Sequence, residues 1–401
     1  MTQPSAAATV SVEALEADPY PIYERLRREE PVSWVESVGL WLVTRWDDVE
    51  HVDTAPEVFT AQTEPSTLNR TFGRNLLGSE GPYHKRIRSI VEPVFRPGAV
   101  RPYIDSIIEP LAGELIDGFA ADGRCDLMNA FAEKLSVRTL QKVLGLGAVE
   151  EERLNGWFND LGVGASNFEG DPEKQAVADA ASRDVNETVA PLLERLATEA
   201  DDSILSRMLH SEVDGERLTP EEISSNLKVM MVGGMQEPGD LIGIAAWAIL
   251  SHPEQAAQVA ADPAGLVKPA VEEVLRWHSP VGTSTRQTTR ATILAGVELE
   301  EGALVAAVVS SANRDERRWT DPDRFDIHRK EGAHLAFAIG SHHCVGSWLA
   351  RAEARTAIRL LFERLPNLRL DADHTVELSG WEFRRPHAVH VRWDGLEGED
   401  T

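Results

Sequence analysis

Apolar residues recur every three or four positions over most of the chain, which is the spacing of one face of an α-helix. The pattern is almost continuous over residues 101–209, and it returns in residues 268–277 and 346–366. Strict alternation, which is typical of strands, is confined to short stretches such as residues 32–44, where Gly39 marks a turn. The sequence therefore predicts a mainly α-helical fold with a small β portion.

The longest and most apolar helical segment covers residues 218–250. Because most of its faces are apolar, it should run through the core. Pro238 follows a pair of glycines in its middle, and proline lacks the N–H that would bond the carbonyl of Gly234. The sequence predicts a kinked central helix with Glu237 at the kink. A buried helix that gives up its own hydrogen bonds often marks a site; the alternative is a plain proline kink.

Charge and composition narrow the class of protein. The 401 residues are 42% hydrophobic, and 40 basic residues face 66 acidic ones, which gives a net charge of −26. Such a surface repels nucleic acid and anionic membranes, so neither is expected as a partner. The N-terminus lacks a signal-peptide pattern, and two cysteines are too few for a disulfide framework. We expect a cytoplasmic protein with a flexible arm over residues 1–17 and one domain over residues 18–401.

Candidate chemistry centres on Cys344, which lies in a glycine-rich stretch, residues 337–346, just before a helical pattern. Free backbone N–H groups at a helix N-terminus stabilise negative charge on sulfur. A thiolate is in turn a strong ligand for iron. The alternative is a buried structural cysteine, which is our interpretation of Cys125 because nothing near it in the sequence would activate it.

Other polar residues are individually weak signals. His84 and Arg88 are spaced to share one helix face, where they either hold an anion or are simply solvated. Glu273 and Arg276 are spaced to pair, but an exposed pair of this kind contributes only about 0.2–0.5 kcal/mol. Residues 55–80 lack a clear period and predict a long loop.

Five motifs in this order resemble the cytochrome P450 superfamily, and the resemblance covers residues 18–393. The motifs are His84-x-x-x-Arg88, the glycine pair Gly233-Gly234, Glu273-x-x-Arg276, Asn313-Arg314-Asp315 followed by Pro322-x-x-Phe325, and Phe337-x-x-Gly340-x-His342-x-Cys344-x-Gly346. The resemblance implies a haem between the kinked central helix and the helix after the cysteine loop. It also implies a monooxygenase that uses dioxygen and two electrons.

The resemblance assigns the site residue by residue. Haem b, iron protoporphyrin IX, would be the cofactor, and Cys344 would be its iron ligand. Phe337 and Gly346 would bind the cofactor as parts of the cysteine loop. The positions that match those holding the haem propionates are His84, Arg88, Arg286 and His342. Cationic donors suit this task because two carboxylates beside iron need strong hydrogen bonds.

Two positions depart from the pattern of the family. The residue after the loop phenylalanine is usually glycine, and here it is Ala338. In the central helix an acid followed by threonine usually relays protons for dioxygen reduction; here Gln236 and Glu237 stand there, followed by proline. The candidate catalytic residues are therefore Gly234, Gln236 and Glu237. Either Glu237 and ordered water form the relay, or protons arrive another way, or the enzyme is not an ordinary monooxygenase.

The run Met-Gln-Glu-Pro-Gly at residues 235–239 and the Gly-Trp-x-Phe-Arg-x-Pro run at residues 380–386 resemble the bacterial aromatic O-demethylase branch, typified by guaiacol O-demethylase. By this resemblance an apolar substrate pocket is lined by Phe72, Val232, Val281, Phe383 and Ala165. Because Ala165 stands where the branch has an aromatic residue, the pocket should be roomier. A small to medium aromatic substrate is expected, with O-demethylation of a methoxyarene as one reaction.

The chain has no dinucleotide loop, flavin segment or iron–sulfur cysteine set, so a separate ferredoxin or flavin/iron–sulfur reductase is the expected electron donor. Four arginines on helices expected near the cysteine are candidates for a docking patch, or else form solvated faces: Arg86, Arg351, Arg355 and Arg359. The alternatives are a biosynthetic P450 that oxidises, couples or rearranges an aromatic intermediate, a peroxide-using enzyme, and a haem sensor or carrier.

Overall fold

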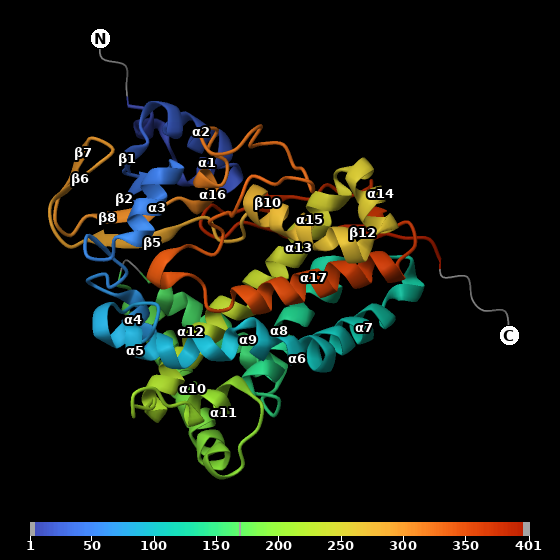
Figure 1. The fold of residues 1–401 in the computed structure, drawn as a ribbon, viewed down its shortest axis with the longest axis horizontal. Helices are drawn as coiled ribbons and strands as arrows, with labels where there is room; N and C mark the ends of the chain where they lie inside the picture. The colour runs from blue at the N-terminus through green and yellow to red at the C-terminus, as the bar shows by residue number, and fades with distance from the viewer. Residues whose placement is uncertain (1–4, 168–169, 396–401) are drawn as a thin grey trace.

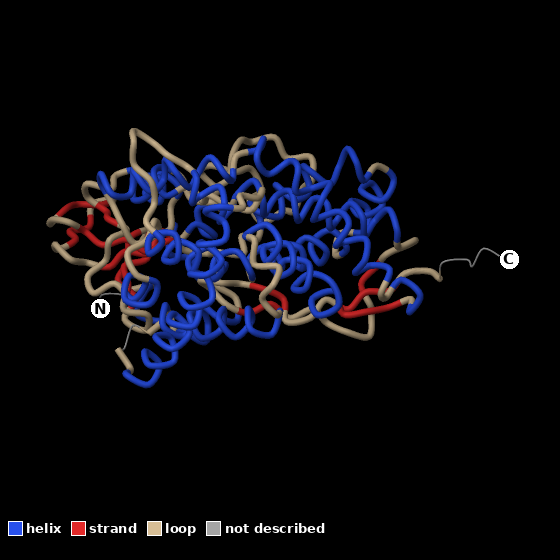
Figure 2. The backbone as a smooth tube through the Cα atoms, turned by 90° about the horizontal axis from the view of Figure 1, so that it is seen from below, coloured by secondary structure: helices blue, strands red, loops and turns tan. Residues whose placement is uncertain are grey.

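The computed structural model describes residues 5–167 and 170–395. Within them the chain is mainly helical with four small sheets, as predicted (Figure 1). Most strands gather at one end of the molecule, and helices fill the rest (Figure 2). No helix in the described part of the chain is both long and apolar enough to cross a membrane.

The largest sheet has five strands in the order β1-β2-β8-β5-β3. Their bounds are Val32–Val35, Leu40–Val43, Leu304–Ala307, Ser284–Thr288 and Phe59–Thr60. The predicted hairpin is confirmed, because β1 pairs antiparallel with β2, and Gly39 takes a φ of +67° in the turn. The smaller sheets are β4-β12-β9 (Arg124–Asp126, His390–Arg392, Arg369–Leu370), β6-β7 (Thr292–Leu294, Val297–Leu299) and β10-β11 (Leu378–Ser379, Arg385–Pro386).

The N-terminal segment contains two short helices that pack on the rest of the fold. Residues 1–4 lie outside the described residues, but a short 3-10 helix η1 (Ala7–Thr9) and helix α1 (Val12–Ala17) follow. Leu15 is fully buried, and the Glu30 carboxylate accepts hydrogen bonds from the first backbone N–H groups of this segment. Residues 5–17 thus pack on the rest of the chain, and we propose that the domain begins there. The flexible arm expected over residues 1–17 stays a prediction.

Helices before the central one form two groups. Those that pack on the large sheet are α2 (Tyr20–Glu29) and α3 (Trp46–Thr54). The second group begins with α4 (Thr67–Phe72) and α5 (Gly81–Val91), which runs into η2 (Glu92–Phe95). The others are α6 (Pro97–Tyr103), η3 (Ile104–Ile108), α7 (Glu109–Asp117), η4 (Ala120–Asp122), η5 (Met128–Ala132), α8 (Glu133–Leu144), α9 (Glu151–Ala165), α10 (Pro172–Thr198) and α11 (Ile204–His210). The loop predicted over residues 55–80 is broken by β3 and α4.

The central segment is two helices, α12 (Pro220–Met235) and α13 (Glu237–Leu250), which meet at Gln236. A capping box between Thr219 and Glu222 fixes the start. The break falls where Pro238 predicts it. The two helices also join different hydrophobic clusters: α12 packs with α8–α11, and α13 packs with α15 and α17. Figure 1 shows α13 and α17 side by side across the molecule.

The remaining helices surround the cysteine loop. They are α14 (Pro253–Ala261), α15 (Pro263–Trp277), α16 (Val309–Ala312), η6 (Gly340–His342) and α17 (Ser347–Arg364). The Glu273–Arg276 pair on α15 is buried, not exposed as its spacing alone suggested. Arg276 donates to both carboxylate oxygens of Glu273, at 2.8 and 2.7 Å, and to three backbone carbonyls. Arg329 adds a third contact to Glu273 at 3.1 Å. The pair therefore joins α15 to the coil before the cysteine loop.

Candidate active site

The cysteine loop holds the sulfur of Cys344 by backbone geometry. The Cys344 N–H donates to the carbonyl of Phe337 at 2.9 Å, and α17 begins three residues after the cysteine. Gly340 takes a φ of +73°, and a Cβ there would lie 2.6 Å from the carbonyl oxygen of Asp53, so only glycine fits. Burial raises the pKa of the Cys344 thiol, and a hydrogen bond from the Gly346 N–H partly offsets this. The loop thus presents one sulfur with a donor aimed at it.

Ala338 explains why the family places glycine after the loop phenylalanine. Its φ of +53° lies in the left-handed region, which costs a residue with a Cβ about 1–2 kcal/mol.

Ala338→Gly is expected to raise the free energy of unfolding by about 1 kcal/mol, because it removes this cost. Urea unfolding followed by far-ultraviolet circular dichroism measures the change. The matched control is Ala336→Gly, two residues earlier, where φ is not positive and glycine should instead destabilise by about 0.5–1 kcal/mol. Equal effects of the two changes would contradict the strain.

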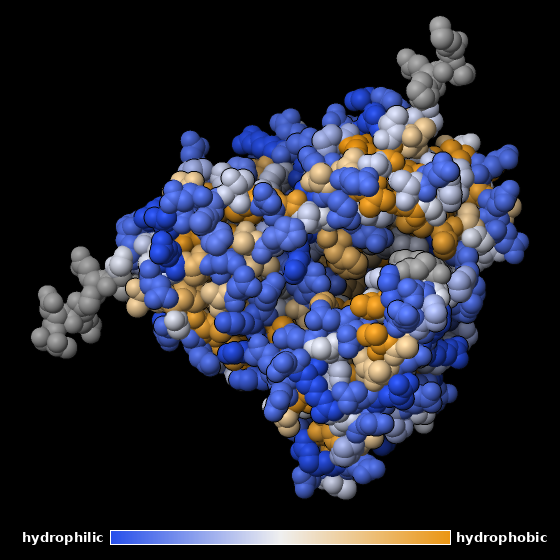
Figure 3. All heavy atoms as spheres, turned by 180° about the vertical axis from the view of Figure 1, so that it is seen from behind, coloured by the Kyte–Doolittle hydropathy of each residue, from blue (hydrophilic) through white to orange (hydrophobic). Residues whose placement is uncertain are grey.

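The sulfur faces a space inside the fold. Cys344 has exposed surface, although burial raises the pKa of its thiol. Gly233, in the middle of the central segment, is exposed too. After burial, the Glu237 carboxylate, when ionised, is a further cause that raises the pKa of the Cys344 thiol, so the helix break and the cysteine loop are within electrostatic reach of each other. Figure 3 shows a deep hollow near the centre of one face, with apolar side chains inside it.

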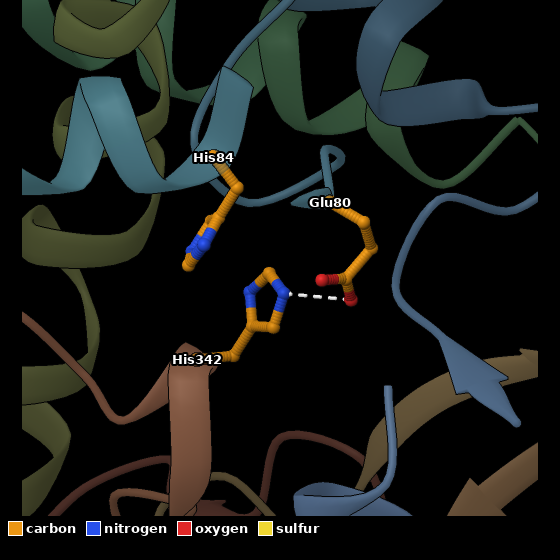
Figure 4. Close-up of side chains that lie close together, drawn as sticks. All are labelled: Glu80, His84 and His342. Atoms are coloured by element: carbon orange, nitrogen blue, oxygen red, sulfur yellow. Dashed lines mark hydrogen bonds and ion pairs between the residues drawn. The ribbon is translucent and has the colours of Figure 1, made fainter. Parts of the chain in front are cut away.

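Two of the predicted propionate-binding residues lie in contact. The rings of His84, on α5, and His342, in η6, have centroids 4.4 Å apart (Figure 4). His342 Nε2 bonds the Glu80 carboxylate at 2.9 Å, and that carboxylate also accepts from the Ala61 N–H. Burial lowers the pKa of His84 to about 4, and its Nε2 has no partner among the described residues. A buried, unpartnered ring nitrogen is suited to an external carboxylate.

The other two predicted residues are engaged by acids. Arg286, on β5, donates to the buried carboxylate of Asp53 at 3.0 Å, and the charge of His342 acts on the same Asp53. Arg88 donates to Glu92 at 2.8 Å, and its charge acts on the Cys344 thiol. The four predicted residues therefore surround one region, together with acids that sequence reasoning missed.

These residues fit a haem. One sulfur with an N–H donor matches an iron ligand, and the unpartnered nitrogen of His84 beside His342 matches a carboxylate-binding edge. Two glycines leave open space: a Cβ built at Gly233 would have no neighbour within 4 Å, and one built at Gly346 would meet only the Cys344 sulfur, at 3.8 Å.

The helix break carries the candidate catalytic residues. Glu237 is the first residue of α13, its Oε2 is buried, and that atom has no partner in the described part of the chain. Burial raises the pKa of Glu237 to about 8, so its carboxyl is protonated at neutral pH. Gln236 donates from Nε2 to Asp240 at 3.1 Å. Gly234 lets α12 approach α8, since a Cβ would lie 3.3 Å from Leu140.

The predicted pocket residues fall into two groups. Phe72, Val232 and Ala165 belong to the hydrophobic cluster around α12, in which Phe72 is buried and the others are partly exposed. Val281 and Phe383 form an isolated antiparallel bridge, and Phe383 is 52% exposed. The structure brings residues far apart in sequence together in each group. Their shared role in binding substrate stays a prediction.

The four arginines expected to form a docking patch are all in ion pairs with acids of the same chain. Arg351 and Arg355 both donate to Glu272, at 2.8 and 2.5 Å. Against the effect of burial, hydrogen bonds from His334 and Arg351 hold the pKa of Glu272 well below its usual range. The remaining two are paired likewise, Arg86 with Glu222 and Arg359 with Glu109 and Glu363. None of the four is a free cation, so the geometry does not support a patch made of them.

Comparisons with known proteins identify the family. A family model described as cytochrome P450 matches residues 265–375. Cytochrome P450 monooxygenase PikC of Streptomyces venezuelae is 35% identical, over 94% of this chain and 91% of that protein. The 6-deoxyerythronolide B hydroxylase of Saccharopolyspora erythraea is 31% identical, over 96% of this chain and 98% of its own length.

Solved structures agree with the sequence relatives. The crystal structure of CalO2 superposes with a TM-score of 0.87 at 28% identity, over 98% of this chain and 100% of that one. The structure of CYP109Q5 from Chondromyces apiculatus gives 0.86 at 28% identity, over 98% of both chains. The similarity to these proteins covers almost the whole chain, including the cysteine loop and the helix break. The chain therefore belongs to the cytochrome P450 family of monooxygenases.

Proposed function

We propose that this P450 oxidises an apolar aromatic substrate of small to medium size, and that Glu237 supplies protons where the family usually has an alcohol. The observation that carries this proposal is the buried, unpartnered carboxyl at the break between α12 and α13, within electrostatic reach of Cys344. P450 relatives use dioxygen and electrons from redox partners such as a ferredoxin, and we expect the same here.

The residues around the cysteine loop hold the cofactor. Cys344 would bind the iron of haem b, with Phe337 and Gly346 shaping the loop beside it. The propionates would lie among the side chains of four hydrogen-bond donors, namely His84, Arg88, Arg286 and His342. When bound, the haem supplies the activation of dioxygen that lets a C–H bond be oxidised.

The chain's own residues supply the proton and exclude water. Because the pKa of Glu237 is raised to about 8, its neutral carboxyl can donate a proton at pH 7. Pro238 leaves the Gly234 carbonyl without its helical donor, so that oxygen is free to hold an ordered water beside the carboxyl. Gln236 is held by Asp240 and fixes the chain direction at the break.

The substrate would lie against apolar side chains, namely Phe72, Val232, Val281 and Phe383, with Ala165 leaving room for a larger ring system. For a methoxyarene, one oxygen atom of dioxygen enters a methyl C–H bond, and the other leaves as water with two electrons and two protons. The hemiacetal then loses formaldehyde and leaves a phenol. O-demethylation is therefore one reaction that this pocket would permit.

A second candidate is hydroxylation of a larger biosynthetic intermediate. The relative named 6-deoxyerythronolide B hydroxylase acts on a molecule much larger than a methoxyphenol. The exposed side chain of Phe383 and the small Ala165 agree with a roomy pocket.

A binding screen tests the proposal. The holoenzyme is mixed with methoxylated benzoates, phenols, larger aromatics and macrocyclic lactones, and the haem spin-state shift is recorded. Binders are then turned over with a surrogate ferredoxin and reductase, and with hydrogen peroxide alone. Formaldehyde from a methoxyarene supports O-demethylation, and a hydroxylated lactone supports the second candidate. If no aromatic compound shifts the spin state, the aromatic assignment is wrong.

Ala165→Phe is expected to weaken binding of the larger aromatics by about tenfold or more, because a ring added to a filled pocket costs about 1–3 kcal/mol. The same change should leave the smallest methoxyphenols unaffected or tighten them. The control is Val163→Phe on the same helix, where the side chain is 38% exposed and addition of a ring should change nothing. Spin-state titrations of both variants give the comparison. If the Ala165 variant and the natural protein bind the larger aromatics with equal affinity, Ala165 does not line the pocket.

A further inference from the structure

We infer that Asp240, Arg385 and Glu133 form the proton inlet to Glu237, leading from solvent to the helix break. This inference rests on the proposed role of Glu237 as proton donor. It concerns residues on the α8 and β11 side of α13. Arg385 is a variable position of the run at residues 380–386, and neither Asp240 nor Glu133 belongs to a motif that the sequence singled out.

Asp240 occupies the middle of this route. It lies one turn after Glu237 on α13 and is only 2% exposed. One carboxylate oxygen accepts from Gln236 Nε2 at 3.1 Å, and the other contacts Arg385 Nη1 at 3.4 Å. Its charge raises the pKa of Glu237, which places the two carboxyls close to each other.

The outer part of the route reaches solvent. Arg385 Nη1 also contacts the Glu133 carboxylate, at 3.3 Å. The side chains of Arg385 and Glu133 are 34% and 42% exposed, while that of Asp240 is 2% exposed. A connected set of polar atoms therefore runs from the surface to the buried turn that carries Glu237.

Close packing fixes the three elements around Asp240. Gly239 lies against the backbone where α8 begins, since a Cβ there would be 3.2 Å from the Ala132 carbonyl. One turn later, a Cβ added at Gly243 would lie 3.3 Å from the side chain of Pro386 in β11. Glycines on two successive turns thus bring Glu133 and Arg385 to Asp240.

The geometry differs from that of a purely structural ion pair. Arg276 holds Glu273 with two bonds of 2.7 and 2.8 Å, whereas Asp240 meets Arg385 through one contact of 3.4 Å. Burial raises the pKa of Asp240 to about 6, with Arg385 opposing and Glu133 adding to the rise. A loosely held carboxyl that takes both charge states near neutrality is suited to pass protons. A purely structural ion pair is instead favoured by a carboxylate that stays charged.

The proposed step moves only protons. Protonated Asp240 releases its proton toward the Glu237 carboxylate through ordered water, and becomes a carboxylate that Gln236 Nε2 and Arg385 hold. It then regains a proton from solvent on the side of Glu133. No electron is transferred, and the net result is one proton moved from solvent to Glu237.

The experiment follows the carboxyl protons of the resting holoenzyme by infrared spectroscopy after rapid mixing into D₂O. The carbonyl stretch of Glu237 is assigned from its loss in Glu237→Gln. Glu353 on α17 is an internal reference, since it is also buried with a pKa raised to about 8 and contacts none of the inlet residues. Its band is assigned from Glu353→Gln.

Asp240→Asn keeps the size and an acceptor for Gln236 but cannot carry a proton. We expect it to slow exchange at Glu237 by about tenfold or more and to leave exchange at Glu353 unchanged. Glu133→Gln, a surface change that preserves the fold, should slow it in the same direction by less. Unchanged exchange at Glu237 in Asp240→Asn would overturn the inlet, and so would equal slowing at Glu353, which would mean a general tightening of the protein.

Turnover separates this inference from the proposed function. If Glu237→Gln leaves product per electron unchanged, Glu237 is not the proton donor, whatever the exchange rates show. If Glu237→Gln loses product but Asp240→Asn exchanges normally, the donor stands and the inlet is wrong.

Discussion

Glutamine in place of Glu237 is expected to lower the product formed per electron consumed by about 100-fold, while haem binding is retained. The amide has the size of the carboxyl but no proton to give at neutral pH. Product, hydrogen peroxide and electrons consumed are measured together with a surrogate ferredoxin system. Glu237→Thr restores the usual alcohol and should retain haem while changing the ratio of product to peroxide. Unchanged ratios in Glu237→Gln and Glu237→Ala would remove Glu237 from the proton relay.

The same residue predicts a pH dependence. Burial raises the pKa of Glu237 from 4.5 to about 8, so the proton donor is present below pH 8 and lost above it. The product formed per electron should therefore fall as pH rises through 8, and a Glu237→Gln variant should lack that step. Because the folded state holds this proton more tightly, stability should also fall as pH rises from 4.5 to 8. Thermal unfolding of the two proteins across this range checks the sign.

Arg276→Leu is expected to cost about 3–5 kcal/mol of unfolding free energy and to yield protein with little haem. The change removes two bonds to buried Glu273 and leaves three backbone carbonyls without their donor. Urea unfolding and the haem content after purification measure the effect.

The matched control is Arg324→Leu, in the coil that Arg276 holds. Arg324 is 69% exposed and makes only one long contact, 3.9 Å to Asp326, so its loss should cost under about 0.5 kcal/mol. If the two variants unfold at the same urea concentration, the buried pair does not stabilise this region.

Local sequence patterns predicted the elements but not the long-range partners. Pro238 was sufficient to locate the break of the central helix, because a missing N–H acts within one turn. The hairpin around Gly39 followed from alternation and one turn residue. Alanine itself gives no sign of the positive φ of Ala338; the glycine that the family usually has at this position was the available signal.

The acids around the site were missed for a different reason. Glu80 bonds His342 across 262 positions, and Asp53 bonds Arg286 across 233 positions. No local periodicity reports such a contact, and each acid looks like an ordinary surface residue in its own segment. The packing of residues 5–17 could not be predicted for the same reason, because it depends on two alanine N–H groups that donate to the Glu30 carboxylate.

The break at Gln236 lies on the boundary between the two largest hydrophobic clusters, with α12 in one and α13 in the other. A straight helix would transmit any shift along its axis from one cluster to the other. Two helices joined at one residue transmit less of that shift. Apart from α8, which contacts both helices, the side chains that pack on α12 can therefore be exchanged with less effect on the packing of α13 against α17 beside the cysteine than one straight helix would allow.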